Sequence, residues 1–369
     1  MMHGVVFAAL LFALPSFAGP AEAILEAAGV RGGMVVHVGC GAGALTAELR
    51  VSEAYTVHGI DQDPAMVARA RAHVKGLGLY GPVSIDRWNG THLPYVENFV
   101  NLLVSEGPLP VSMAEVLRVL APRGVAYIKE GGEWTKTVKP VPPEIDDWTH
   151  YLYDASNNAV AHDTVVGPPR RIQWIGSPRY SRHHDKMSSM SAAVSAKGRL
   201  FYIFDEAPPV SILLPPEWRL VARDAFNGAV LWKRDIAEWH DHTWGLKNGP
   251  AQLPRRLVAE GDRVYAPLGL HTPILELDAA TGETLQEYAG TESTEEFLLH
   301  EGLIVAVVKE SGGADDKGAA ARRGEALYAG RWDGAPRRLV AVDTATGKTV
   351  WADGRRVLPG SLAVDGARV

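Results

Sequence analysis

The sequence contains a single cysteine, Cys40. A disulfide within the chain and a zinc site built from cysteines are therefore excluded. No apolar run reaches the ~20 residues that a membrane-spanning helix needs, so we expect no integral membrane span. Basic residues are not in excess either, since 37 Lys and Arg stand against 43 Asp and Glu. A net charge of −6 gives no reason to expect a nucleic-acid partner.

What is present describes an ordinary globular chain with many turns. The 369 residues are 46% hydrophobic and 22% charged, with a mean hydropathy of −0.05. At roughly 100–200 residues per domain, this length predicts two domains or three. The 38 glycines and 24 prolines indicate a turn-rich architecture.

Residues 1–18 have the features of an export signal. Their apolar run ends before small residues, Ser16 and Ala18, which fit a signal-peptidase site before Gly19. A positively charged start is missing, because His3 is the only candidate, so a buried N-terminal helix is the alternative. We expect an exported protein of the periplasm or cell envelope, or a cytoplasmic one if the segment is not cleaved.

Residues 19–139 alternate between strand and helix patterns. Met34–Val38 predicts a strand that leads into Gly39, Gly41 and Gly43, and a helix follows. Glycines permit a tight turn and let backbone N–H groups approach a ligand at the start of a helix. Further strands are expected at residues 55–60, 83–85, 99–104 and 125–129, and helices at 21–30, 44–50, 65–75 and 113–120. The alternation predicts a parallel sheet that binds its ligand at the carboxyl ends of the strands.

The second strand ends in a carboxylate. Asp61 lies 22 residues after Gly39, which is the spacing at which a doubly wound fold binds ribose hydroxyls. A glycine cluster alone is a weak signal, but strand, glycine turn, helix and carboxylate together predict a site for a nucleotide-type ligand.

Four segments, in this order, resemble the motifs of class I S-adenosylmethionine-dependent methyltransferases: VVHVGCGAG (35–43), GIDQDP (59–64), Leu93-Pro94 and EVLRVLAPRGVAYI (115–128). The resemblance implies a Rossmann-like fold, methyl transfer, and S-adenosylmethionine as cofactor. It places the three loop glycines against the methionine part of the cofactor. Asp61 would bind the ribose and Asn89 the adenine amino group.

Several positions depart from the family pattern. His37 stands where the family usually carries an acid that helps to hold the cofactor's ammonium group, and Asn101 stands where the fourth strand commonly starts with Asp. Asn89 also stands where the family often has Asp. The imidazole of His37 and the amides of Asn89 and Asn101 thus replace three carboxylates, and we expect this to weaken cofactor binding. No motif nominates an acceptor base, so the catalytic residues are unknown. Nothing before residue 140 resembles the last two strands of that family or a substrate lid, so the domain is expected to be short.

Residues 140–369 contain a repeated phrase: RDAFNGAVLW (223–232), LDAATGETLQ (277–286) and VDTATGKTVW (342–351). Asp begins a turn with a bond from its side chain to the backbone, Gly takes the left-handed position, and a strand follows. Each phrase therefore predicts a β-hairpin. A Trp eight residues after the Asp, present in two copies, is expected to dock between neighbouring sheets.

A second glycine phrase accompanies the hairpins: SAKGRLFY (195–202), AEGDRVYA (259–266), HEGLIVAV (300–307) and VDGARV (364–369). The combination resembles the pyrroloquinoline-quinone-type repeat and implies an all-β propeller of about three blades plus the start of a fourth. Segment 148–175 looks like the lead-in that completes the last blade of such domains. Because a propeller closes with 4–8 blades, we expect a fragment of a longer protein, or assembly with another chain.

Quinone chemistry has little support in the sequence. Dehydrogenases of the propeller family would require adjacent cysteines and an Asp–Glu–Asn set around calcium. No cysteine follows Cys40 and no such acidic set is recognisable, so we do not expect bound pyrroloquinoline quinone. His183-His184-Asp185 and His240-Asp241-His242 are the only metal-like groups. They lack a recognised spacing, so we predict no metal site and regard a peptide- or sugar-binding rim or solvated loops as the alternatives.

Three functions remain open. The first is a methyltransferase whose propeller binds a substrate or a partner, protein or carbohydrate, with an unknown methyl acceptor. The second is an exported, non-catalytic binding scaffold with a degenerate methyltransferase fold. Export favours the second, because S-adenosylmethionine is a cytoplasmic metabolite. A quinone-dependent dehydrogenase is the weakest of the three.

Overall fold

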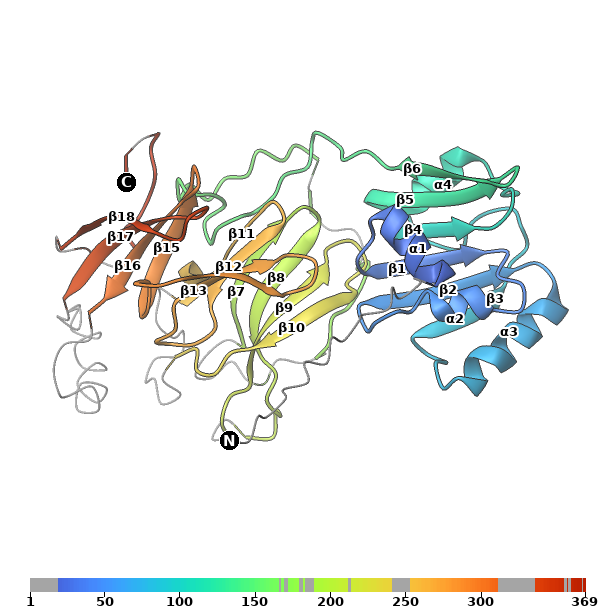
Figure 1. The fold of residues 1–369 in the computed structure, drawn as a ribbon, viewed down its shortest axis with the longest axis horizontal. Coiled ribbons are helices and arrows are strands. Elements are labelled where there is room, and N and C mark those ends of the chain that lie inside the picture. Colours follow the sequence, from blue (N-terminus) through green and yellow to red (C-terminus); the bar gives the residue numbers. More distant parts are fainter. Residues whose placement is uncertain are drawn as a thin grey trace, which may run out of the picture.

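The computed structural model describes residues 19–165, 167–168, 172–178, 182, 189–211, 214–240, 253–310, 336–354, 357, 360–366 and 368–369. The expected export signal lies outside these ranges. Within these ranges, an α/β domain is followed by three antiparallel sheets, which are arranged along the long axis of the molecule (Figure 1). Within the described residues, no helix is long and apolar enough to cross a bilayer.

A six-stranded sheet with the order β3-β2-β1-β4-β5-β6 forms the first domain. Its parallel strands are β1 (Gly33–Val38), β2 (Tyr55–Asp61), β3 (Val83–Arg87), β4 (Val100–Ser105) and β5 (Leu120–Glu130). The helices are α1 (Pro20–Ala28), α2 (Ala44–Glu48), α3 (Pro64–Gly76) and α4 (Met113–Val119). The expected parallel sheet is therefore confirmed.

Helices cover both faces of this sheet. Apolar residues of α1, α2 and α3 pack on one face together with Val35 and Val57. Val116 and Val119 of α4 pack on the other face, against Val36. Strands buried on both sides need continuous apolar runs rather than alternating ones, which explains why β1 and β4 could be recognised from the sequence.

The sheet has one strand more than the sequence pattern predicted. β6 (Glu133–Val138) pairs antiparallel with β5 after a turn at Gly131-Gly132. This strand is hydrophilic and largely exposed, so it lacks the apolar run of a buried strand. Trp134 instead stacks on Tyr127 of β5, with ring centroids 4.6 Å apart.

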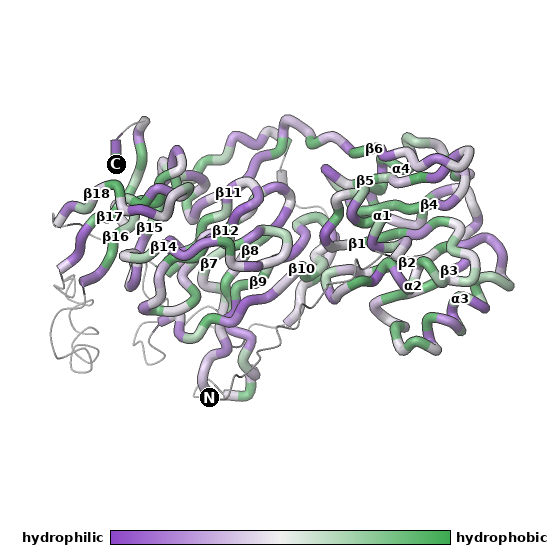
Figure 2. Tube along the Cα trace, viewed as in Figure 1, coloured by the Kyte–Doolittle hydropathy of each residue, from purple (hydrophilic) through white to green (hydrophobic). Residues whose placement is uncertain are grey.

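Each of the three antiparallel sheets has four strands in chain order. The first contains β7 (Met190–Ala196), β8 (Arg199–Asp205), β9 (Trp218–Asp224) and β10 (Val230–Asp235). After the 3-10 helix η1 (Leu253–Arg256), the second contains β11 (Val258–Glu260), β12 (Arg263–Pro267), β13 (Ile274–Asp278) and β14 (Thr284–Tyr288). The third contains β15 (Thr294–His300), β16 (Leu303–Lys309), β17 (Arg337–Asp343) and β18 (Thr349–Asp353). Hydrophobic residues concentrate in these strands (Figure 2).

The repeated phrases form the predicted hairpins. In each sheet, the Asp that ends the third strand accepts backbone N–H groups of the following turn through Oδ1. The Gly four residues later is left-handed in all three copies, with φ of 74°, 74° and 67° at Gly228, Gly282 and Gly347. A bond from the side chain to the backbone and a left-handed Gly are the two elements that the sequence pattern specifies.

Trp232 docks between the first and second sheets, as expected. Its Nε1 donates to the carbonyl of Ala279 (3.1 Å), and a Cβ on Gly282 would lie 2.6 Å from its ring. Trp174, which precedes the first sheet, packs in the same manner on Gly228, where a Cβ would lie 2.4 Å from the ring. The tryptophan and the glycine of the next turn therefore form one recurring contact.

Segment 148–155 crosses the first strand of each sheet in turn. Backbone N–H groups at similar positions donate to it: Ser195 to the carbonyl of Trp148 (2.7 Å), Ala259 to that of Thr149 (3.0 Å) and Leu299 to Nε2 of His150 (3.1 Å). Val364 donates in the same way to the carbonyl of Ala155 (2.9 Å). The segment therefore ties the three sheets and the last residues together.

The first repeat turn also binds the α/β domain. Asn101 of β4 donates through Nδ2 to Asp224 Oδ2 (2.7 Å), and its Oδ1 accepts from Asn227 Nδ2 (2.6 Å) and from the Met34 N–H (2.7 Å). Arg31 lies 3.7 Å from Asp278 of the second repeat. Both contacts lie at the amino ends of β1 and β4.

Candidate functional site

The loop after β1 begins at the carboxyl edge of the sheet. Its three glycines are left-handed, with φ of 72°, 52° and 86° at Gly39, Gly41 and Gly43. A Cβ on Gly39 or Gly41 would meet no atom within 4 Å, whereas one on Gly43 would lie 2.8 Å from the Cβ of Ala70. The first two glycines therefore face open space, where a ligand can approach the backbone. Gly43 permits the close contact between α2 and α3.

Asp61 joins this loop to the end of β2. Its Oδ2 accepts the N–H of Gly41 (2.9 Å), and its Oδ1 accepts the N–H of Asp63 (3.0 Å). Each carboxylate oxygen has two lone pairs, so the half-buried group retains acceptor capacity for a ligand hydroxyl. The structure thus brings Asp61 and the glycine loop together, as the spacing of 22 residues indicated.

His37 lies beneath the loop rather than in it. Its side chain is 1% exposed, and Nδ1 forms a hydrogen bond with the hydroxyl of Thr46 (2.8 Å). Among the described residues, Nε2 is buried without a hydrogen-bond partner. Burial lowers the pKa of His37 to about 4, although the nearby carboxylate of Asp61 raises it in part. The imidazole is therefore neutral at pH 7.

Asn89 follows β3 at the same edge of the sheet and is exposed. Its Oδ1 accepts from the N–H (3.1 Å) and the hydroxyl (2.9 Å) of Thr91. The amide oxygen thus stabilises the local turn. The assignment of Asn89 to the adenine amino group remains a prediction, as do the cofactor contacts of the loop glycines, His37 and Asp61.

The interpretation of Asn101 as part of the cofactor site is wrong. Asn101 lies at the start of β4, where its side chain binds Met34 and the first repeat turn. Gly39 is five residues further along β1, which at about 3.3 Å per residue is roughly 16 Å away. An amide at position 101 therefore serves the domain interface and has no direct effect on a ligand at the glycine loop.

Two groups near the loop were not identified from the sequence. Glu106 directly follows β4, and its Oε2 lies 3.9 Å from Nε2 of His37. An acid immediately after a predicted parallel strand is a signal that could have identified it. The second group is His58 on β2, whose Nδ1 bonds with the Tyr95 hydroxyl (2.9 Å) and whose Nε2 bonds with Asp86 (3.1 Å), so that the loop after β3 is fastened to the sheet.

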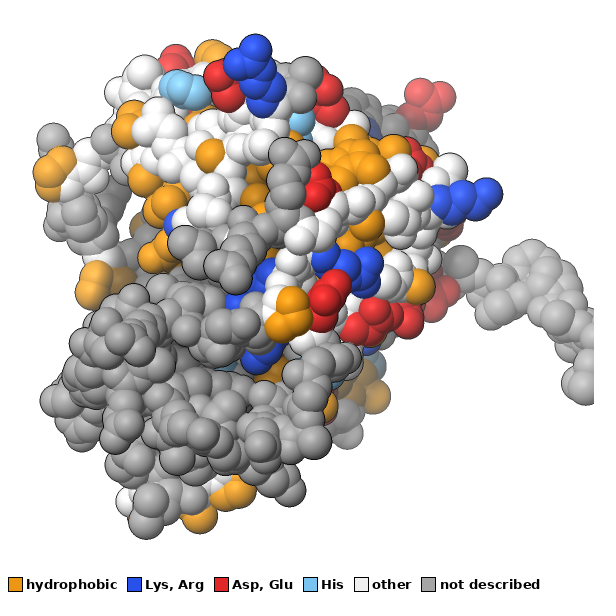
Figure 3. Space-filling view, turned by 90° about the vertical axis from the view of Figure 1, so that its left-hand side faces the viewer, with side chains coloured by type: hydrophobic (Ala, Val, Ile, Leu, Met, Phe, Trp, Pro, Cys, Tyr) orange, Lys and Arg blue, Asp and Glu red, His pale blue; other side chains and the backbone are white. Residues whose placement is uncertain are grey.

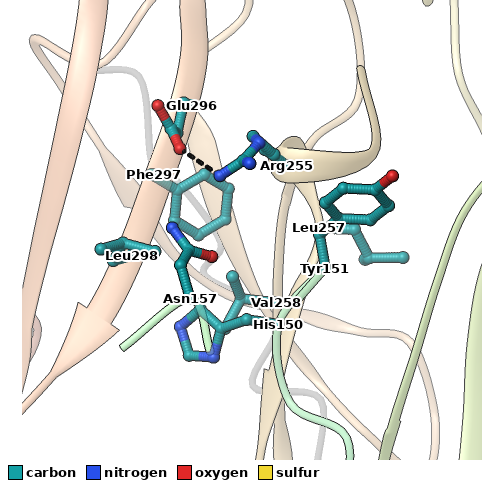
Figure 4. Close-up of a pocket in the computed structure, with 9 residues that line it drawn as sticks. All are labelled: His150, Tyr151, Asn157, Arg255, Leu257, Val258, Glu296, Phe297 and Leu298. Atoms are coloured by element: carbon teal, nitrogen blue, oxygen red, sulfur yellow. Dashed lines mark hydrogen bonds and ion pairs between the residues drawn. The ribbon is translucent and has the colours of Figure 1, made fainter. Parts of the chain in front are cut away.

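A small pocket lies between the second and third sheets (Figure 4). Glu296, fully buried, accepts from Arg255 Nη1 (2.8 Å) and from the N–H groups of Gly360 and Leu362. Arg255 also lies over the ring of Tyr151, 5.5 Å from its centroid. Glu296 thus ties η1 and residues 360–362 to the third sheet, and Arg255 contacts segment 148–155, so this pocket is a packing junction.

Of the two histidine groups, only His240 lies within the described residues. The other members lie outside them: His183, His184, Asp185, Asp241 and His242. His240 is buried, with its ring 5.3 Å from that of Trp218. Within the described part of the chain, no three His, Cys, Asp or Glu side chains are placed to hold a metal ion.

Comparison with known proteins bears on the first domain. Residues 35–124 match the methyltransferase domain family. The match spans β1 to the start of β5, including the glycine loop and Asp61, so the first domain is methyltransferase-like. The match does not extend to the three antiparallel sheets, whose propeller character stays a prediction.

Individual relatives cover the same part of the chain. An uncharacterized protein of Haemophilus influenzae is 28% identical over 99 residues, which are 25% of this chain and 39% of that protein. A SAM-dependent methyltransferase from Aquifex aeolicus is 27% identical over 30% of this chain and 62% of its own, with a TM-score of 0.28. Geranyl diphosphate C-methyltransferase from Streptomyces coelicolor is 20% identical over 29% and 43%, with a TM-score of 0.28. The chain thus spans less than two thirds of each of these proteins.

Proposed function

We propose that residues 19–139 bind S-adenosylmethionine at the carboxyl edge of the sheet and act as a methyltransferase domain. The observation that carries this proposal is the pairing of Asp61 with the Gly41 N–H beside the open space over Gly39. A carboxylate at the end of one strand can bind the ribose hydroxyls, and an accessible glycine backbone at the end of the neighbouring strand can contact the group that the ribose carries. The family match of residues 35–124 supports the same ligand.

The residues present fit an adenosine-type cofactor in two respects. The first is the open space over Gly39 and Gly41, which a Cβ at either position would partly occupy. The second is Asp61, whose carboxylate is held in place by two backbone N–H groups. The cofactor supplies the methyl group when it is bound. Asp61 would orient the ribose, and the loop backbone would contact the amino-acid part. The methyl acceptor and its base remain unassigned.

Calorimetry with S-adenosylhomocysteine tests the proposal on the whole chain. We expect binding that Asp61→Ala weakens at least tenfold, since a hydrogen bond to a charged group contributes about 1.5–3 kcal/mol. Asp63→Ala is the matched control. It removes a carboxylate from the same loop, but one that caps α3 by accepting the Ala65 N–H (2.8 Å). Absence of binding at millimolar ligand would refute the proposal.

For the three sheets we propose consecutive blades of a β-propeller. Their support is the recurring contact onto the left-handed glycine of the next turn, made by Trp174, Trp232 and, in the second repeat, Gln286, whose Nε2 would lie 2.5 Å from a Cβ on Gly347. Trp351, the equivalent residue of the third repeat, is 39% exposed. Its strand, β18, lies at the end of the molecule that Figure 3 faces, where hydrophobic side chains are visible at the surface.

A non-catalytic scaffold, exported after cleavage before Gly19 and binding a protein or carbohydrate partner, is the second candidate. The neutral imidazole of His37 in place of an acid favours it. The two candidates differ in two measurements, which are cofactor binding and the mature N-terminus in the native host. A mature protein that starts at Gly19 and binds no S-adenosylhomocysteine would establish the scaffold. An intact N-terminus together with binding would exclude it.

A further inference from the structure

The end of β4 carries a carboxylate to which the cofactor assignment gives no role. Glu106 follows Ser105, the last residue of β4, and its side chain is 56% exposed. β4 pairs with β1 in parallel, with His37 opposite Val104. The carboxyl ends of both strands therefore meet beside the glycine loop. This geometry brings Glu106 Oε2 to 3.9 Å from His37 Nε2.

The buried imidazole needs a partner in this direction. Its Nδ1 is occupied by the Thr46 hydroxyl, whereas Nε2 has no hydrogen-bond partner among the described residues. A buried polar group left without a partner is costly. When the Thr46 hydroxyl donates to Nδ1, the ring proton stays on Nε2 and points towards Glu106. If the exposed Glu106 side chain rotates so that its Oε2 moves about 1 Å towards His37 Nε2, the two atoms come within hydrogen-bond distance.

We propose that Glu106, positioned by His37, is the carboxylate that receives the ammonium group of the cofactor's amino-acid part. This inference rests on the proposed function. A charge-assisted hydrogen bond between ammonium and carboxylate is the strong form of such a contact. Glu106 thus restores, from the neighbouring strand, a negative charge that position 37 does not provide.

The surroundings of His37 suit this role. Burial keeps the imidazole neutral at pH 7, so it brings no positive charge that would repel an ammonium group. The other charge that acts on the ring is the carboxylate of Asp61, which also favours a cation in this region. One Glu106 oxygen can accept from His37 while the other faces the open side of the loop. His37 is therefore a positioning residue, whereas Glu106 makes the contact.

Two ligands isolate the amino-acid part. S-adenosylhomocysteine and 5′-methylthioadenosine are both uncharged at sulfur and share the adenosine group, but only the first carries the ammonium group. We expect Glu106→Gln to weaken binding of S-adenosylhomocysteine to the whole chain at least tenfold in calorimetry and that of 5′-methylthioadenosine less than twofold. Glu48→Gln, which removes an exposed carboxylate of α2, is the control and should change neither affinity.

The role of His37 is tested in the same assay. His37→Leu should weaken S-adenosylhomocysteine selectively, and it should add nothing in a Glu106→Gln background, because it acts through Glu106. His37→Gln keeps an N–H donor and should restore part of the selectivity. A merely structural role would weaken both ligands. If His37→Leu fails to fold, the Glu106→Gln result decides the proposal.

Two different results separate the role of Glu106 from cofactor binding by the domain. If the unaltered chain binds both ligands and Glu106→Gln changes their affinities equally or not at all, the role of Glu106 is refuted and the cofactor site stands. If the unaltered chain binds neither ligand, the proposed function fails and the inference fails with it.

Discussion

Replacing Trp232 by Ala tests whether neighbouring sheets are held together by the recurring tryptophan contact. The indole is 8% exposed and belongs to the core cluster that joins the first and second sheets. Its Nε1 donates to the carbonyl of Ala279 in the second sheet. Gly282 leaves the space that the ring occupies, since a Cβ there would lie 2.6 Å from it. The change therefore opens a cavity between two sheets and leaves a carbonyl unpaired.

The expected loss of stability is about 5 kcal/mol. A Trp→Ala change in a core costs about 3–5 kcal/mol through lost burial and the remaining cavity. The hydrogen bond to Ala279 adds about 1 kcal/mol. Trp351→Ala provides the matched control, because it is the same change at the same position of the third repeat. Trp351 is 39% exposed, so we expect its removal to cost about 1 kcal/mol.

Urea unfolding followed by circular dichroism measures both variants. The difference in free energy of unfolding between them should be about 4 kcal/mol, and hydrogen exchange should locate the new opening in β9, β10, β12 and β13. Equal losses for Trp232→Ala and Trp351→Ala would refute the reasoning, because the docking contact would then contribute nothing beyond the strand itself. So would a loss confined to the first sheet.

Three further changes test other parts of the structure. Gly43→Ala should destabilise the first domain by about 1–3 kcal/mol in thermal unfolding, since its Cβ would lie 2.8 Å from that of Ala70 at a φ of 86°. Burial lowers the pKa of His150 to about 4. The free energy of unfolding should therefore be full above pH 6.5 and should fall by up to about 3 kcal/mol as the pH drops towards 4. In His150→Gln this decrease at acid pH should be smaller. Asn101→Asp places a second carboxylate against Asp224, and burial already raises the pKa of Asp224. The two domains should then unfold in separate thermal transitions, while the affinity for S-adenosylhomocysteine stays unchanged. A single transition, as in the unaltered chain, would contradict this prediction.

The sequence predicted those elements whose residues carry their own signal. β1 and β4 are buried on both faces and read as continuous apolar runs, and the hairpin turns depend on an Asp and a left-handed Gly a few residues apart. β6 had no such signal, because its strength comes from pairing with β5 and from Trp134 stacking on Tyr127. Tertiary contacts, rather than local residue preferences, make it a strand.

The sequence predicted only those parts of the candidate site whose residues lie close together along the chain. The glycine loop and Asp61 follow from spacing along a single β-α-β unit, and the structure brings them together. Glu106 and His37 are 69 residues apart in the chain, so their proximity depends on β4 lying beside β1. Asn101 was misplaced for a related reason. Alignment of a motif identifies a strand, but the function of a residue depends on which end of that strand it occupies.

The position of the three sheets limits what they can do for the first domain. Their turns bind at the amino ends of β1 and β4 through Asp224, Asn227 and Asp278, whereas the glycine loop and Glu106 lie at the carboxyl ends, roughly 16 Å further along the strands. A partner held on the sheets is therefore not delivered directly to the loop by these contacts. Under the proposed function, substitutions on the sheets that weaken a partner's binding should therefore leave S-adenosylhomocysteine affinity at the loop unchanged.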